Sequence, residues 1–218
     1  MNAVVPAIGV DESGKGDYFG PLVIAGVYSG EEVEEKLKRL NIRDSKLISD
    51  NRVLVLAAEI KKHAKYSVVV IGPKKYNELY EKFKNLNKLL AWGHARVIEN
   101  LLEVVPAKKV IADKFGHDKF IRAALMEKGK QIEVVFETKA ERHFCVAAAS
   151  ILARAEFLTQ LKELSASIGF DLPKGASKEA EAGVLKLRDL KGFDIFKEVA
   201  KLHFKTTQKL LIQKNLFQ

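Results

Sequence analysis

Two short apolar runs flank a glycine-rich turn near the start of the chain, and this pattern predicts two β-strands in direct succession. The runs are Val4 to Val10 and Leu22 to Tyr28, and both contain several Val and Ile residues. Turn-forming residues lie between them, at Ser13 to Asp17 and at Gly20-Pro21. Glycine and proline interrupt strands and favour turns. The fold is therefore expected to begin with two strands of one sheet.

Apolar patterning in the rest of the chain predicts alternating helices and strands. Three further strands are expected at Tyr66 to Ile71, Lys108 to Ala112 and Gln131 to Phe136. Strands linked both directly and through helices indicate a mixed sheet. We therefore expect an α/β fold, with a mixed five-stranded sheet flanked by helices and a helical C-terminal part from about residue 170. The expected helices are Glu31 to Leu40, Asp50 to Lys62 with Asp50 as its cap, Lys74 to Phe83, Asn87 to Glu103, the stretch after Glu141, Lys178 to Leu190 and Phe193 to Gln213.

Composition limits the class of protein. The 218 residues are 47% hydrophobic, which suffices for one core. No continuous apolar run reaches the ~18 residues that a membrane span needs, and the first residues lack the pattern of a signal peptide. The single cysteine, Cys145, excludes an intramolecular disulfide. We therefore expect one domain over residues 1–218, in a cytoplasmic monomer without membrane association.

The net charge of +9 points to an anionic partner. A basic surplus of this size raises the local concentration of polyanions, of which nucleic acid is the most common. The alternative is a basic protein whose charge serves only solubility.

Two of the expected strands end in carboxylates. Asp11 and Glu12 follow the first apolar run, and Asp113 follows Lys108 to Ala112. A buried carboxylate is costly unless a cation or hydrogen bonds stabilise it. If these two strands lie side by side in the same direction, Asp11 and Asp113 meet at one edge of the sheet. The alternative for Asp113 is a helix cap.

Glu141 is a further candidate because it precedes a helix of small apolar residues. Its alternative role is that of a first-turn carboxylate that favours the helix dipole. Glu137 is a rival acid, and His143 is expected to be structural. Several carboxylates in one basic protein suggest phosphodiester chemistry with two divalent ions, for which oxygen ligands select Mg²⁺ or Mn²⁺.

These segments resemble the type 2 ribonucleases H, the ribonuclease HII/HIII family, and most closely its HIII branch. The matching residues follow the family's order over nearly the whole chain. They are Asp11 to Pro21, Asp44 to Lys46, Tyr76-Asn77, Leu86 to Ala95, Asp113, Thr138 to Glu141, Ala147 to Arg154, Leu172 to Ala176 and His203 to Lys205.

The resemblance implies a ribonuclease H-like fold and an endoribonuclease that hydrolyses the RNA strand of RNA/DNA hybrids, leaving 5′-phosphate and 3′-hydroxyl ends. The family's four metal-binding acids map onto Asp11, Glu12, Asp113 and Glu141. They imply two divalent ions, Mg²⁺ or Mn²⁺, with Asp11 bridging both. Glu141 and Gly14-Lys15-Gly16 favour the HIII branch, because HII enzymes usually have Asp and Gly-Arg-Gly there.

The sequence as given begins almost with its first strand. We therefore expect it to lack the N-terminal substrate-binding extension that is usual in the HIII branch, so that affinity comes from the catalytic domain. Incision at single ribonucleotides in duplex DNA, the HII type of activity, stays an alternative. The expected partner is accordingly an RNA/DNA hybrid or a ribonucleotide-containing duplex.

The glycine-rich loop is the expected substrate contact. Gly14 and Gly16 allow the backbone to approach a nucleic-acid strand closely, and their N–H groups can bond phosphate or a 2′-hydroxyl. Lys15 adds a positive charge, and Ser13 and Lys46 are assigned to the substrate as well. The alternatives are an ordinary turn for the loop and a solvated side chain for Lys46.

The C-terminal segment offers three lysines that are four residues apart. In a continuous helix, Lys201, Lys205 and Lys209 would share one face and could line the backbone of a hybrid. The alternative is a solvated stripe. Tyr18 is expected either near the ribose or in the core, whereas His94 is expected to serve core packing.

Two other functions share parts of this pattern. A nucleic-acid-binding protein without catalysis would account for the charge but not for the carboxylates. A nuclease of the same fold that acts on DNA junctions would account for the carboxylates but would not need ribose. Metal-dependent cleavage tests the first alternative, and an all-DNA duplex tests the second.

Overall fold

The computed structural model describes residues 5–42, 45, 48–113 and 119–209, apart from the side chain of Lys38, and they form two compact units. The first unit consists of the described parts of Met1–Ser13, Val23–Val69 and Asn85–Glu156. The second consists of Gly14–Leu22, Val70–Lys84 and the described part of Phe157–Gln218. Each unit is thus assembled from segments that lie far apart in the sequence.

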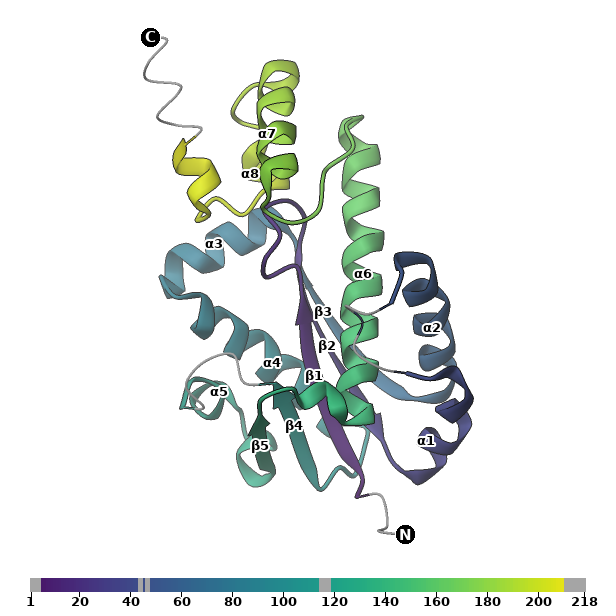
Figure 1. Cartoon of the computed structure of the whole chain (residues 1–218). Helices are drawn as coiled ribbons and strands as arrows, with labels where there is room; N and C mark the ends of the chain where they lie inside the picture. Colours follow the sequence, from purple (N-terminus) through teal and green to yellow (C-terminus); the bar gives the residue numbers. More distant parts are fainter. Residues whose placement is uncertain (1–4, 43–44, 46–47, 114–118, 210–218) are drawn as a thin grey trace. The chain divides into compact units, whose positions relative to one another are not determined.

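A mixed five-stranded sheet forms the centre of the first unit (Figure 1). Strand β1 pairs antiparallel with β2 and parallel with β4, and β4 pairs parallel with β5. The expected α/β fold with a mixed five-stranded sheet is therefore confirmed. In order across the sheet, the strands are β3 (Lys65–Ile71), β2 (Leu22–Ser29), β1 (Ala7–Ser13), β4 (Lys109–Asp113) and β5 (Glu133–Glu137).

One glycine of the sheet and one of helix α4 (Leu86–Leu102) allow this helix to lie close to one face of the sheet. A Cβ atom on Gly26 of β2 would lie 2.5 Å from Val97 Cγ1. Within α4 itself, a Cβ atom on Gly93 would lie 2.6 Å from Ile24 Cδ1. The absence of side chains at both glycines therefore sets how closely this helix packs on β2.

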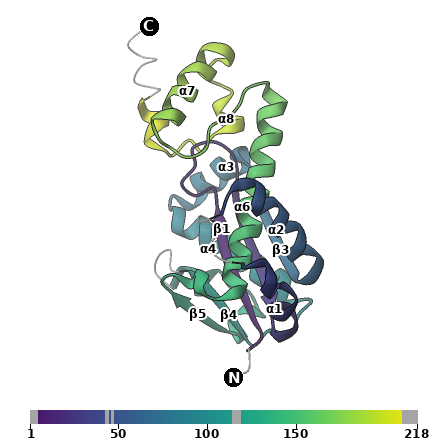
Figure 2. The ribbon, with the colours of Figure 1, turned by 45° about the vertical axis from the view of Figure 1, so that its right-hand side comes forward.

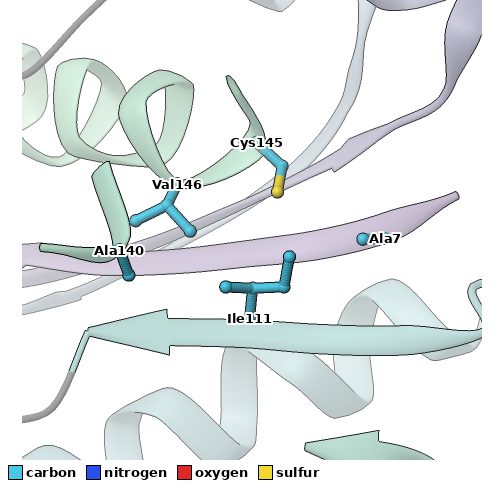
Figure 3. Packing of buried hydrophobic residues seen from close by; sticks show 5 residues of the cluster. All are labelled: Ala7, Ile111, Ala140, Cys145 and Val146. Atoms are coloured by element: carbon cyan, nitrogen blue, oxygen red, sulfur yellow. The ribbon is translucent and has the colours of Figure 1, made fainter. Parts of the chain in front are cut away.

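The opposite face of β1 packs against the start of α6 (Phe144–Ile168). A Cβ atom on Gly9 would lie 2.2 Å from the backbone carbon of Cys145, so only glycine fits between this strand and the helix. Figure 3 shows the buried residues beside this contact, which come from β1, β4, a short turn and α6. They are Ala7, Ile111, Ala140, Cys145 and Val146.

The remaining helices agree in position with most of the expected ones. Asp50 does not cap its helix as expected; Ser49 holds the cap position, and Asp50 instead accepts a hydrogen bond from Arg154 of α6 at 2.6 Å. In the first unit, the other helices are α1 (Glu31–Leu37), which continues into a 3-10 turn at Lys38–Leu40, α2 (Asp50–His63), α5 (Lys119–Ala124) and a 3-10 turn at Gly129–Gln131.

The second unit contains α3 (Pro73–Phe83), α7 (Lys178–Lys191) and α8 (Phe196–Val199), and α3 packs against α8 (Figure 2). Its core includes the fully buried rings of Tyr18 and Phe19, which contact each other edge to face with centroids 4.8 Å apart. Both rings also contact Phe196. The turn segment between β1 and β2 therefore belongs to this core.

The expected continuous helix from Phe193 to Gln213 is wrong. Helix α8 ends at Val199, residues 200–204 are not helical, and residues 205–209 are helical again. The helix is interrupted because Ala200 forms an antiparallel bridge with Phe19 instead of continuing the helical hydrogen-bond pattern.

Among the helices that the structure describes, α6 alone is long and apolar enough, by length and composition, to cross a membrane. However, 67% of its most apolar stretch is buried inside the structure. This burial is typical of a core helix, and the contact of Cys145 with Gly9 agrees with that interpretation.

Candidate active site

Strands β1 and β4 bring two carboxylates to the same edge of the sheet. They run parallel, with Gly9 paired to Ile111, so Asp11 and Asp113 follow two residues later on neighbouring strands. Because side chains alternate along a strand, both acids lie on the face that carries Gly9 and Ile111, which is the α6 face. The expected side-by-side arrangement of these two strand ends is confirmed. Strand β1 itself continues to Ser13 through its pairing with β2.

The turn that carries Glu141 is tied to the side chain of Asp113, at the end of β4, by a hydrogen bond from a backbone N–H. Glu141 lies in a 3-10 turn, Ala140–Arg142, and precedes α6 as expected, because α6 begins only at Phe144; the alternative position in the first turn of that helix is not observed. Lys139 enters this turn in the left-handed conformation, with φ of 57°, which is uncommon for a residue other than glycine. The N–H of Ala140 then donates to Oδ1 of Asp113 at 3.3 Å. Asp113 therefore caps the turn that carries Glu141.

Glu12 lies on the opposite face of β1 from Asp11, toward α4. Its Oε2 atom is 3.0 Å from Nε2 of His94, and the two side chains are 9% and 0% exposed, respectively. A hydrogen bond of this kind stabilises a carboxylate that is largely removed from water. The expectation that His94 only packs in the core was incomplete, since this histidine is also the partner of a candidate catalytic acid.

Glu137, the rival acid, is paired with Asp113 in the β4–β5 register. Its Oε2 atom lies 2.9 Å from Nε2 of His143 and also accepts a hydrogen bond from Arg142. The hydrogen bond from His143, together with that from Arg142, lowers the pKa of Glu137. Because Glu137 already pairs with Arg142 and lies within hydrogen-bond distance of His143, it is a weaker candidate for holding a cation than Asp113.

The donor atoms at this edge suit a hard divalent cation. Asp11, Asp113 and Glu141 supply carboxylate oxygens, which Mg²⁺ and Mn²⁺ prefer. Among residues 5–42, 45, 48–113 and 119–209, no three His, Cys, Asp or Glu side chains are gathered closely enough to hold a metal ion. Asp11 and Asp113 therefore fit a metal site by the type of their side chains and by their strand positions, and Glu141 fits it by type and by its turn beside Asp113.

The two glycines of the expected substrate loop have different surroundings. Gly14 has φ of 86°, and a Cβ atom there would lie 2.2 Å from the carbonyl oxygen of Pro21. At Gly16, by contrast, a Cβ atom would meet no heavy atom of the described chain within 4 Å, and both Gly16 and Lys15 are exposed. The fold thus explains the glycine at position 14, whereas it leaves the glycine at position 16 without a structural reason.

The other expected substrate residues are less informative. Ser13 is the last residue of β1 and pairs with Val23 of β2. Lys46 lies outside the residues that the structure describes. Tyr18 belongs to the core, because its ring is fully buried and its hydroxyl lies 3.1 Å from Oγ1 of Thr207.

The expected helical stripe of Lys201, Lys205 and Lys209 is wrong, because Lys201 does not belong to it. Lys201 lies in the non-helical segment after α8 and is fully buried. Lys205 and Lys209 are exposed in the helical stretch 205–209, where Lys209 pairs with Glu181 of α7 at 2.5 Å. The bridge of Ala200 with Phe19 turns the chain inward at this point.

The mixed sheet flanked by helices, with carboxylates on adjacent parallel strands, defines a ribonuclease H-like protein. The family model described as ribonuclease HII matches residues 8–207, and the chain belongs to this family. Ribonuclease HIII of Protochlamydia amoebophila is 44% identical over 208 residues, which cover 95% of this chain and 69% of that protein. The protein is therefore an enzyme of the ribonuclease H type, as the resemblance implied.

Solved structures of the HIII branch share the fold. Bst-RNase HIII in complex with Mn²⁺ superposes with a TM-score of 0.88 at 32% identity, covering 96% of this chain and 70% of that one. RNase H3 of Aquifex aeolicus superposes with a TM-score of 0.74 at 37% identity, covering 92% of this chain and 72% of that one.

Proposed function

We propose that this chain is an endoribonuclease that hydrolyses the RNA strand of RNA/DNA hybrids with Mg²⁺ or Mn²⁺, leaving 5′-phosphate and 3′-hydroxyl ends. The observation that carries the proposal is the parallel pairing of β1 and β4, which aligns Asp11 with Asp113 at one sheet edge. The similarity to enzymes named ribonuclease HIII, one of them solved with Mn²⁺, supports the substrate and the metal.

In this proposal, Asp11, Asp113 and Glu141 hold two divalent ions. When bound, such ions lower the pKa of the attacking water and neutralise charge at the scissile phosphate. Asp113 keeps the turn of Glu141 in place through the N–H of Ala140. Glu12 is the fourth acid, and His94 orients its carboxylate.

The loop of Ser13, Gly14, Lys15 and Gly16 binds the nucleic-acid strand. Gly16 is exposed and has open space where a side chain would stand, so a phosphate or a 2′-hydroxyl can approach its backbone closely. Lys15 and Lys46 supply positive charge for phosphates. The net charge of +9 supports binding through the backbone of the duplex.

Product mapping on end-labelled duplexes tests the activity. The substrates are an RNA/DNA hybrid, a DNA duplex with one ribonucleotide and an all-DNA duplex, each with Mg²⁺, Mn²⁺ or a chelator. We expect metal-dependent cleavage of the hybrid. Cleavage of only the single-ribonucleotide duplex would assign the HII type of activity, and cleavage of the all-DNA duplex would contradict the proposal. Binding without cleavage of any duplex would leave a nucleic-acid-binding protein.

A pair of carboxylate substitutions tests the site. Asp11→Asn should lower kcat on the hybrid by at least about a thousandfold, equivalent to roughly 4 kcal/mol of transition-state stabilisation, with hybrid binding retained. Glu137→Gln is the matched control, because it also removes a carboxylate at a neighbouring strand end. The control should keep kcat far closer to that of the wild type than Asp11→Asn does, because Glu137 is engaged by Arg142 and His143 and is not one of the four assigned acids. Full activity of Asp11→Asn would refute the assignment.

A further inference from the structure

Lys201 is a buried ammonium that is held by backbone carbonyls. Its side chain is fully buried, and its Nζ atom lies 2.8 Å from the carbonyl oxygen of Asp17, 3.3 Å from that of Phe19 and 2.7 Å from that of Gly20. The ring of Tyr76 lies on another side, with its centroid 5.8 Å from Nζ. All three N–H donors of an ammonium thus have an oxygen acceptor within reach.

The burial of this charge is costly and needs a reason. An unpaired ammonium in an apolar surrounding is strongly disfavoured. Burial lowers the pKa of Lys201 to about 7, and the nearby carboxylate of Asp17 partly offsets this effect. Only the protonated amine has three donors for three carbonyls, so the geometry favours the charged form. A Leu or Met at this position would avoid the desolvation cost, yet it would leave the carbonyl oxygens without a donor.

The three carbonyls belong to the segment that directly follows the substrate loop. The N–H of Asp17 donates to the carbonyl of Gly14 at 3.3 Å, which closes the turn that contains Lys15 and Gly16. Lys201 is connected to the next residues through its own backbone as well, since its N–H donates to the carbonyl of Tyr18 at 2.9 Å. One residue therefore holds four consecutive members of this segment, Asp17 to Gly20.

A second anchor acts on the same segment. The N–H of Gly175 donates to Oδ1 of Asp17 at 2.6 Å, and the N–H of Tyr18 donates to the carbonyl of Gly175 at 2.9 Å. This anchor leaves the carbonyls of Phe19 and Gly20 to Lys201. Lys201 is thus the residue that completes the hydrogen bonding on the C-terminal side of the loop.

We propose that Lys201 is a positioning residue for nucleic-acid binding, whose ammonium holds the carbonyls of Asp17, Phe19 and Gly20 so that the preceding loop, through Lys15 and Gly16, presents a preformed contact to the phosphate backbone of an RNA/DNA hybrid. The proposal rests on the proposed function for its ligand. Preorganisation of a binding loop improves affinity because less conformational entropy is lost when the ligand binds. Lys201 itself touches no phosphate, since its side chain is fully buried.

The test measures binding of a fluorescent RNA/DNA hybrid by anisotropy, in a chelator so that no cleavage occurs. Lys201→Met and Lys201→Gln remove the charge, and Lys197→Met is the control. The substitution at Lys197 removes the same charge four residues earlier in the chain, but the Lys197 side chain is exposed and pairs with Asp194. We expect Lys201→Met to raise Kd by about tenfold, Lys201→Gln to raise it less, and the control to change it by less than about twofold.

The salt dependence of Kd separates positioning from direct contact. Lys201→Met should keep the wild-type slope of log Kd against log salt, whereas loss of a direct phosphate contact lowers that slope by about 0.9. An unchanged Kd in Lys201→Met, or a lowered slope, would overturn the proposal. So would the loss of cooperative unfolding in both variants, because Lys201 would then serve stability alone.

Cleavage by the wild type is measured separately. Binding without cleavage would contradict the proposed function, whereas the comparison of Kd values would still test the positioning role of Lys201. Absence of hybrid binding by the wild type would overturn both.

Discussion

Nε2 of His94 lies 3.0 Å from Oε2 of Glu12, and this contact joins helix α4 to strand β1 over 82 residues of sequence. Glu12 thereby has a fixed partner on the α4 face, whereas Asp11 points to the α6 face with Asp113. The neighbouring acids Asp11 and Glu12 are consequently supported by different parts of the fold.

Removal of the histidine should impair the site through Glu12. We expect His94→Gln to lower kcat/KM on the hybrid by about 10- to 100-fold, the usual effect of losing a residue that orients a metal-binding side chain. The measurement is a double-mutant cycle with Glu12→Gln, in which the combined effect should be no larger than that of Glu12→Gln alone. Simple addition of the two effects would show that His94 acts on something other than Glu12.

Substitutions of Gly14 and Gly16 should have different effects, the first on the stability of the fold and the second on hybrid binding. Gly14→Ala should destabilise the fold by about 1–3 kcal/mol, because its Cβ would meet the carbonyl oxygen of Pro21 and its φ is positive. Gly16→Ala should leave the urea midpoint unchanged yet weaken hybrid binding by several fold, as measured by anisotropy. A destabilised Gly16→Ala, or one that binds normally, would favour an ordinary turn.

Acid should weaken the second unit through His203. Burial, and to a lesser degree the charge of Lys201, lowers the pKa of His203 to about 4. Between about pH 6.5 and 4 the unfolded chain therefore binds a proton at this position that the folded chain does not. Stability rises with pH in this window, so this contribution is lost as the pH falls through it.

The variant His203→Gln should show a smaller loss of stability on acidification than the wild type. Urea midpoints at about pH 7 and about pH 4.5 measure the difference, and carboxylates that titrate in both proteins cancel in the comparison. An equal loss in the two proteins would mean that His203 is protonated in the folded state.

Local patterns sufficed for most of the fold. The strand Lys109–Asp113 and the helix Pro73–Phe83 are each within a residue of expectation, because apolar periodicity is a local property. The sequence predicts that Asp11 and Asp113 lie close together only if their two strands are parallel neighbours, and β1 and β4 do pair in parallel. The assignment of Asp11, Glu12, Asp113 and Glu141 to catalysis stays a prediction.

What the sequence could not reveal depends on distant partners. Lys201 has helical spacing to Lys205, yet carbonyls from residues 17, 19 and 20 draw it into the core. His94 stands in an apolar helix, where burial is predictable but a carboxylate partner is not. Glu141 precedes a helical pattern, and the extended conformation of His143, with φ of −81° and ψ of 131°, separates its 3-10 turn from α6.

The contact between Gly9 and Cys145 has a consequence for variation among related enzymes. The backbone of β1 meets the backbone of α6 at this point, so no side-chain rotation can make room for even a methyl group. In a randomised library, selection for soluble, folded protein would therefore return glycine at position 9 even on a catalytically dead background. An invariant glycine there would reflect the close packing of strand and helix, and it would carry no information about the substrate specificity of the enzyme.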